Sequence, residues 1–124
     1  MVDCLFCKII KGEIPSHKIY EDENVYAFLD ISAKVVGHTL VVPKKHCVNI
    51  LDCSEENLNF VINAVKKIAN HYMKQGFTGF NLQVNNGESA GQEVPHLHFH
   101  ILPRGNETLN GKNLSEICEI LKLY

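Results

Sequence analysis

Hydrophobic and polar positions recur along the chain with two periods, one typical of a long helix and one typical of strands. Between residues 54 and 76, apolar residues return every three or four positions, which predicts an amphipathic helix packed on a sheet. Ser54 is a suitable N-cap, and Gly76 is suitable just past the C-terminus. The stripe expected to face the sheet comprises Leu58, Val61, Ile62, Val65, Ile68, Ala69 and Tyr72.

Shorter segments carry the signals of strands and are separated by polar turns. We expect strands, each rich in alternating or β-branched residues, at 18–21, 25–30, 38–43, 78–85 and 96–102. Short helices are expected at residues 4–11 and 114–124, and residues 104–112 are expected to form a polar loop.

The segment 96–102 alternates strictly between histidine and apolar residues. In a strand, successive side chains point to opposite faces, so Leu97, Phe99 and Ile101 would share the core face. The opposite face would then carry a row of three imidazoles from His96, His98 and His100.

Imidazoles in such a row suit either metal ligation or nucleophilic and acid–base catalysis. At about 3.3 Å per residue, His96 and His100 are ~13 Å apart, which is too far for all three to hold one zinc ion. One terminal histidine could still bind a metal with ligands from elsewhere while the others serve a substrate.

Composition and charge narrow the class of protein. The 124 residues, 45% of them apolar, predict one domain, and the net charge of −2 argues against a nucleic-acid partner. No apolar run approaches the ~20 residues that span a bilayer, and no signal peptide is evident. Five cysteines without a regular framework indicate a reduced protein, which we expect to be cytoplasmic.

The Cys4-x-x-Cys7 pair is ambiguous by itself. It suits a redox pair, half of a zinc site or a chance spacing, and the redox interpretation lacks a thioredoxin-like context. A zinc site would need two further nitrogen or sulfur ligands. We interpret the other cysteines as small buried hydrophobic residues, namely Cys47, Cys53 and Cys118.

Several motifs together resemble one known family. The histidine row, the loop Asn85–Pro95, the segment Gly37–His46 and the segment Phe28–Ile31 are similar to markers of the histidine triad (HIT) superfamily. The similarity runs from about Cys4 to Pro103 and is closest to the branch of histidine triad nucleotide-binding proteins that hydrolyse nucleoside phosphoramidates.

This resemblance implies an α+β fold, with an antiparallel sheet of about five strands, one long packed helix and short terminal helices. It also implies a homodimer. We expect a single HIT domain over residues 1–124, with a core at 4–103 and a C-terminal tail at 104–124.

The resemblance further implies a mechanism without a catalytic metal. His98 would attack the phosphorus of a purine nucleoside 5'-phosphoramidate, and water would hydrolyse the nucleotidyl-histidine to a nucleoside monophosphate. The backbone carbonyl of His96 would hold the His98 Nδ1 proton. The phosphate oxygens would accept hydrogen bonds from His38, His100, Asn85 and the backbone near Gly91, Gln92 and Glu93.

Binding residues follow from the same resemblance. Asp30 would accept hydrogen bonds from the ribose hydroxyls of an AMP-like ligand, and the base would lie against Leu5, Phe6, Phe28 and Ile31. A structural zinc would be held by Cys4, Cys7, His46 and His96. Many family members have a hydroxyl residue at position 93, whereas this chain has Glu93, so the leaving-group preference stays open.

Three rival interpretations remain. A dinucleoside polyphosphate hydrolase would share the site but cleave a different bond. A nucleotide- or zinc-binding regulatory module would bind without turnover, and a metallohydrolase would lose its activity with a chelator.

Overall fold

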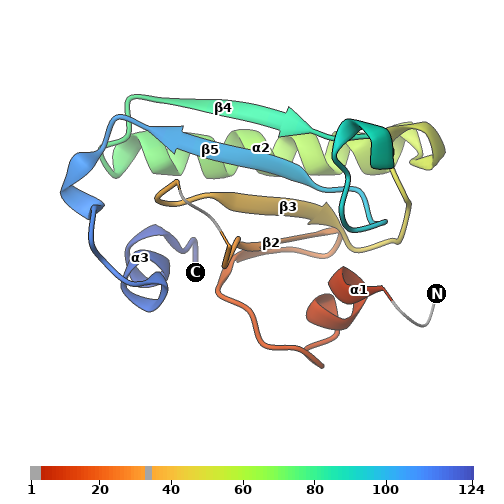
Figure 1. Ribbon diagram of the computed structural model, residues 1–124, viewed down its shortest axis with the longest axis horizontal. Coiled ribbons are helices and arrows are strands. Elements are labelled where there is room, and N and C mark those ends of the chain that lie inside the picture. Colours follow the sequence, from red (N-terminus) through yellow and green to blue (C-terminus); the bar gives the residue numbers. More distant parts are fainter. Residues whose placement is uncertain (1–3, 33–34) are drawn as a thin grey trace.

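One five-stranded antiparallel sheet organises the protein. The computed structural model describes residues 4–32 and 35–124. The strands are β1 (Lys18–Glu21), β2 (Val25–Leu29), β3 (Thr39–Pro43), β4 (Gly79–Val84) and β5 (Phe99–Arg104). They lie in the order β1-β2-β3-β5-β4, and every neighbouring pair is antiparallel (Figure 1). The expected α+β fold with five strands is confirmed.

The helices also follow the expected order. They are α1 (Leu5–Ile10), α2 (Glu55–Lys74) and α3 (Leu114–Leu121), joined by the short 3₁₀ turns η1 (Ile50–Asp52), η2 (Glu88–Ala90) and η3 (Glu107–Leu109). None of the helices in the described part of the chain has the length and apolar character needed to cross a bilayer.

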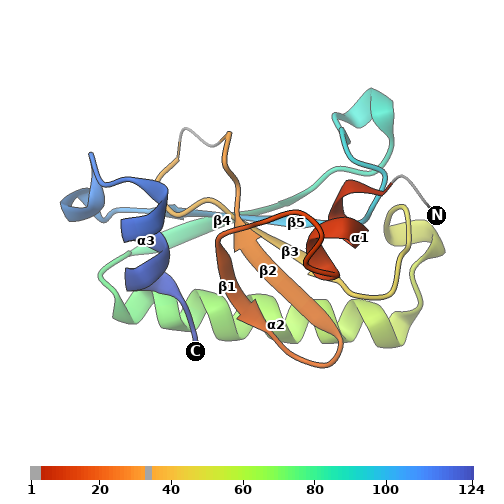
Figure 2. The same ribbon diagram turned by 90° about the horizontal axis from the view of Figure 1, so that it is seen from below.

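The long helix α2 covers one face of the sheet along most of its length (Figure 2). Ser54 caps it, because its Oγ accepts a hydrogen bond from the Asn57 backbone N–H at 3.1 Å. Gly76 follows the helix end with φ +104°, a left-handed value that favours glycine. Ile62 is 44% exposed, unlike most of the predicted stripe, because it lies at the edge of that stripe.

The other face of the sheet is covered only in part. There α1 packs over β2 and β3 through a second apolar cluster formed by Cys4, Phe6, Ile9, Tyr26, Phe28, Leu40 and Val42. The loop that carries η2 lies on the same face as α1 (Figures 1 and 2).

The histidine row begins before the strand that was predicted to carry it. β5 starts at Phe99, because its pairing with β3 ends at Val41 and its pairing with β4 ends at Val84. Residue 97 instead donates its backbone N–H to the Cys47 carbonyl at 2.8 Å. The predicted division of faces nevertheless holds, since Leu97, Phe99 and Ile101 all lie in the main core.

The C-terminal helix is shorter than predicted. It ends at Leu121, and the following residues turn back along β1. Leu123 donates its backbone N–H to the Ile19 carbonyl at 2.8 Å, and the Tyr124 hydroxyl donates to the Lys18 carbonyl at 3.1 Å. These contacts fix the end of the chain against the edge strand of the sheet.

A candidate active site and a Cys/His cluster on one row of histidines

His98 is held in one orientation at the centre of the row. Its Nδ1 lies 2.7 Å from the His96 carbonyl oxygen, which can only accept a hydrogen bond, so Nδ1 carries the proton. The Nε2 of neutral His98 therefore has a free lone pair. The edge of the Phe6 ring packs beside His98, with the ring centroids 5.0 Å apart and the planes at 90°. These contacts orient a nucleophilic nitrogen.

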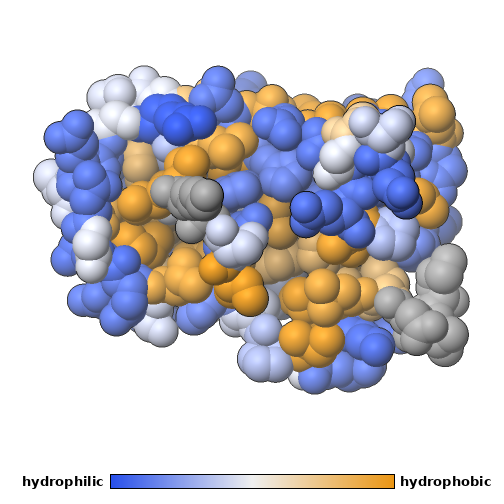
Figure 3. Space-filling view, in the orientation of Figure 1, coloured by the Kyte–Doolittle hydropathy of each residue, from blue (hydrophilic) through white to orange (hydrophobic). Residues whose placement is uncertain are grey.

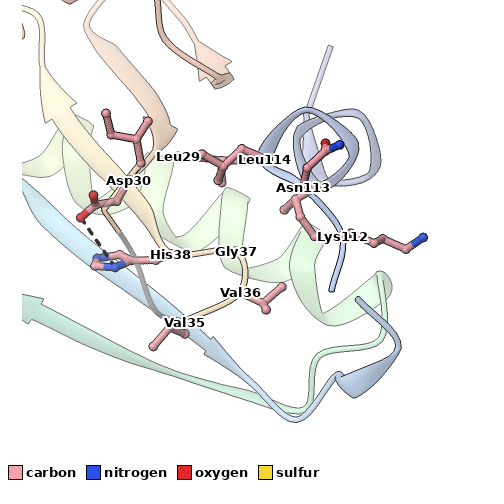
Figure 4. Close-up of a pocket in the computed structure, with 11 residues that line it drawn as sticks. Leu29, Asp30, Val35, Val36, Gly37, His38, Lys112, Asn113 and Leu114 are labelled. Carbon is pink, nitrogen blue, oxygen red and sulfur yellow. Dashed lines mark ion pairs between the residues drawn. The ribbon is translucent and has the colours of Figure 1, made fainter. Parts of the chain in front are cut away.

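Two further imidazoles and a carboxylate form a chain beside His98. His100 Nδ1 lies 2.9 Å from His38 Nε2, and His38 Nδ1 lies 3.7 Å from the Asp30 carboxylate. Figure 4 shows the Asp30 carboxylate directed at the His38 ring. Sheet register brings these residues together, because His38 directly precedes β3 and Leu40 pairs with His100 in β5.

Burial keeps these imidazoles neutral near pH 7. Loss of solvation lowers the pKa of His38 and of His98, and it lowers the pKa of His100 to about 4. The carboxylate of Asp30 acts in the opposite direction on all three rings. The site therefore offers neutral imidazoles, which suits a nucleophile.

The neutral state also fixes the proton positions along the chain. The Asp30 carboxylate favours a proton on His38 Nδ1, which leaves His38 Nε2 to accept the proton of His100 Nδ1. His100 Nε2 is then an acceptor, and it is buried without a hydrogen-bond partner among the described residues.

The loop between β4 and β5 is fixed by one buried side chain. Gln92 accepts a hydrogen bond from the Gly87 backbone N–H at 2.9 Å and donates to the carbonyls of Val48 and Val94. The backbone N–H groups of Gly91 and Gln92 donate to the Glu88 and Gly87 carbonyls. Both N–H groups therefore donate within the loop, whereas the family resemblance implied that they donate to a phosphate.

Most of the predicted site residues line a groove of about 350 Å³. Its lining comprises Leu5, Phe6, Asp30, Ile31, Ser32, Leu40, Asn85, Gly91, Glu93, Val94, His98 and His100. Leu5 is 43% exposed and Ile31 is 76% exposed, so the groove presents apolar side chains at its surface. Apolar side chains gather over α1, whereas the neighbouring loop around η2 is hydrophilic (Figure 3).

Three residues that were predicted to contact the ligand lie outside this lining, namely His38, Phe28 and Gln92. His38 instead contacts His100, with His38 Nε2 2.9 Å from His100 Nδ1. Phe28 is buried in the second cluster and contacts Phe6 edge-on, with ring centroids 5.4 Å apart, so it supports the wall without forming it. The Gln92 side chain lies inside the loop, as described above.

The structure also adds groove residues that the sequence interpretation missed. Leu40 lies two positions after His38 in the predicted strand 38–43, so a period of two would have placed both on one face. Ser32 and Val94 carried no comparable signal in the sequence.

The other end of the histidine row belongs to a separate group, here called the Cys/His cluster, formed by Cys4, Cys7, His46 and His96. One donor atom from each residue lies within 4.8 Å of the others. His96 Nδ1 is 3.3 Å from Cys4 Sγ, 3.5 Å from Cys7 Sγ and 3.1 Å from His46 Nδ1. Tetrahedral zinc with ordinary ligand distances needs separations of roughly 3.3–3.8 Å. The two distances from His96 to the cysteines fit this range, and the two histidine nitrogens are about 0.2 Å closer than the ion requires.

The hydrogen bonding of His96 supports this fit. Its Nε2 donates to the Pro43 carbonyl at 2.9 Å, which leaves the lone pair of Nδ1 directed into the cluster. His96 is 0% exposed and burial lowers its pKa to about 4, so the ring is neutral. A backbone carbonyl behind a histidine is the usual support for a metal ligand.

A second cavity, of about 250 Å³, shares a wall with the groove. It lies between residues 29–31 and 35–38 on one side and the start of α3 on the other, and Asp30 and His38 are part of its lining (Figure 4). Apolar side chains form much of the remainder, with Val36, Leu114 and Ile117 among them.

Comparisons with known proteins agree with this arrangement. The family model of the HIT domain matches residues 11–107. A HIT-like protein of Methanocaldococcus jannaschii is 54% identical over 101 residues, which cover 82% of this chain and 78% of the relative. An adenosine 5'-monophosphoramidase of Schizosaccharomyces pombe is 42% identical over 106 residues, which cover 86% of this chain and 77% of the relative.

A solved structure is similar over nearly the whole chain. It is a zinc-bound histidine triad family protein from Mycobacterium smegmatis, with a TM-score of 0.89 and 35% identity. The match covers 98% of this chain and 91% of that one.

Proposed function

The chain belongs to the HIT domain family, and we propose that it hydrolyses purine nucleoside 5'-phosphoramidates or related nucleotide conjugates. The observation that carries the proposal is the 2.7 Å hydrogen bond between His98 Nδ1 and the His96 carbonyl. It leaves Nε2 unprotonated in the groove, which is the requirement for an imidazole nucleophile.

In the first step, His98 Nε2 forms a bond to the α-phosphorus and the bond from phosphorus to the leaving nitrogen breaks. The leaving nitrogen takes that electron pair and a proton from solvent, which reaches the groove mouth at the exposed Glu93. In the second step, the oxygen of water bonds to phosphorus and the bond to Nε2 breaks. Nucleoside monophosphate leaves with one water proton on its phosphate, the other water proton passes to solvent, and His98 returns to its starting state.

Phosphate binding in this proposal depends on hydrogen-bond donors placed around His98. His100, supported by His38, and Asn85 stand beside His98 and are proposed to donate to the phosphoryl oxygens. Because His100 Nε2 is an acceptor in the free protein, it must take up a proton when phosphate binds. Among backbone groups, the N–H of Glu93 replaces the occupied N–H groups of Gly91 and Gln92 as the proposed donor.

The nucleoside is proposed to occupy the end of the groove formed by α1 and the start of the loop after β2. Asp30 would accept from the ribose hydroxyls, and the base would lie against Leu5, Phe6 and Ile31. A largely apolar wall with a few polar groups is typical of nucleotide-sized sites.

The Cys/His cluster is proposed to hold structural zinc. Four protein ligands close the coordination sphere, so the ion would have no free position for a substrate. Zinc would tie α1, the loop after β3 and the start of the histidine row together. His96 then acts on the reaction only through its carbonyl.

A homodimer is also proposed, with β4 and α2 at the interface. β4 is an edge strand of the sheet, and its side chains include Phe80 and Leu82, which are 41% and 44% exposed. Ile62 on α2 is 44% exposed. Exposed apolar groups beside an unpaired edge favour pairing with a second copy.

The proposed function is tested with an adenosine 5'-phosphoramidate that carries a fluorogenic amine. Wild type should release the amine, and His98→Ala should not, with His17→Ala as the control because His17 lies outside the groove. Release should survive brief treatment with a chelator, whereas a metallohydrolase would stop. AMP binding without release by wild type would contradict the proposal and favour a binding module.

A further inference from the structure

The proposed catalytic groove is negatively charged, although its proposed substrate is an anion. Two of its lining residues are carboxylates, Asp30 and Glu93, and none of the described lining residues is Lys or Arg. Phosphate sites more often employ Arg, Lys or a metal ion to balance charge.

The two carboxylates lie in different parts of the groove. Asp30 follows β2, and its Oδ1 accepts hydrogen bonds from the Ser32 backbone and hydroxyl at 2.9 and 2.7 Å. Glu93 reaches the lining from a different segment, the loop before β5. Both residues line the same groove as His98.

Glu93 combines a fixed backbone with an uncommitted carboxylate. The side chain of Gln92 bonds to the Val94 carbonyl at 3.1 Å, so the peptide bonds on both sides of Glu93 are restrained. Among residues 4–32 and 35–124, no hydrogen bond or ion pair engages the Glu93 carboxylate. The side chain is exposed at the groove wall, where it can meet a charged group on a ligand.

This inference rests on the proposed function, which places the nucleoside at the Asp30 end and leaves the Glu93 wall for the leaving group. We propose that Glu93 selects substrates by the charge of the leaving group. The preferred class is nucleoside phosphoramidates whose leaving amine carries a second, positively charged ammonium group. Leaving groups with a carboxylate, sulfate or further phosphate are disfavoured.

The reaction itself is unchanged by this selection. Glu93 attracts a distant ammonium group on the leaving amine and takes no part in bond making, so it is a specificity residue. An exposed carboxylate at a few ångströms from one charge changes the rate constant by up to about fivefold at low salt. The ratio of the rate constants for a cationic and an anionic leaving group of equal length is correspondingly larger, and salt reduces this ratio.

Three adenosine 5'-phosphoramidates of matched length test the proposal. Their leaving amines are 1,5-diaminopentane, hexylamine and 5-aminopentanoate, which end in a positive, a neutral and a negative group. The ratios of kcat/KM for AMP formation are compared among wild type, Glu93→Gln and Glu93→Lys. Glu88→Gln is the matched control, because Glu88 lies on the same loop but outside the groove lining.

Wild type and Glu88→Gln should rank the substrates positive, neutral, negative, with a spread of tenfold or more between the extremes that shrinks at high salt. Glu93→Gln should remove most of the spread and Glu93→Lys should reverse it. An unchanged spread in Glu93→Gln, or a spread insensitive to salt, would overturn the role of Glu93. Absence of AMP from all three substrates would instead overturn the proposed hydrolase.

Discussion

The two ends of the histidine row have the same residue type in the same alternation but different surroundings. His96 is 0% exposed, is enclosed by two cysteines and a histidine, and has its Nε2 bonded to a carbonyl. His98 and His100 face an open groove with one ring nitrogen each directed away from a backbone or histidine partner. The comparison shows that the second partner of an imidazole, and its access to solvent, decide whether it suits a metal or a substrate.

One covalent connection joins the two ends. The His96 side chain serves the Cys/His cluster while its carbonyl fixes the His98 tautomer. A mutation in the cluster should therefore affect stability more than catalysis. A mutation in the groove should affect catalysis more than stability.

The largest expected effect on activity comes from His98→Ala. Loss of the proposed nucleophile should lower kcat/KM for phosphoramidate hydrolysis by at least about 1,000-fold, because the two-step route is no longer available. AMP binding and zinc content should stay near those of wild type, as measured by calorimetry and metal analysis. Equal loss in a His17→Ala control would show that the assay reports folding and not the site.

The cluster should give the opposite result. Cys7→Ser removes one of four proposed zinc ligands, and we expect the free energy of unfolding to fall by about 3 kcal/mol or more. Thermal unfolding and bound zinc measure this change, with Cys53→Ser as the control because Cys53 lies outside the cluster. The surviving folded fraction should keep most of its kcat, and a complete loss of kcat at unchanged stability would contradict the division of roles.

Within the groove, His100 should matter less than His98. His100→Gln keeps a polar side chain but removes the imidazole that is proposed to donate to phosphate, and kcat/KM should fall by about 100-fold. In His38→Gln, kcat/KM should fall by a smaller factor, because His38 acts only through its 2.9 Å contact with His100. A greater loss in His38→Gln than in His100→Gln would place His38, and not His100, against the phosphate.

The smallest expected effect is a proton taken up on ligand binding. The pKa of His100 is about 4 in the free protein, and a bound phosphate should raise it, so affinity should increase as pH falls from 7.5 to 5.5. Calorimetry of AMP binding in buffers of different ionisation enthalpy measures the uptake. His100→Gln should reduce it, whereas proton release by wild type would contradict the proposed tautomers.

Local patterns in the sequence predicted most of the fold. The period of α2, its Ser54 cap and the glycine after its end are local features, and the structure contains all three. The start of β5 was misplaced because it depends on where β3 and β4 stop, which no alternation within residues 96–102 contains. The end of α3 was misplaced for a similar reason, since Leu123 pairs with Ile19 far along the chain.

The site was predictable to a lesser degree. Alternation assigned the histidines to one face, and the family resemblance proposed partners for each. Neither could show that the Gln92 side chain forms its hydrogen bonds within and beside the loop, or that Phe28 packs against Phe6. Such details depend on packing between segments distant in sequence, and so does the pairing of Asp30 with His38.

The stereochemical course of the reaction tests the central claim most directly. A thiophosphoramidate of adenosine with one configuration at phosphorus would be hydrolysed in water labelled with heavy oxygen, and the configuration of the product determined. Attack by His98 followed by water inverts phosphorus twice, so the account predicts overall retention. Overall inversion would show direct attack by water and would contradict a covalent intermediate on His98.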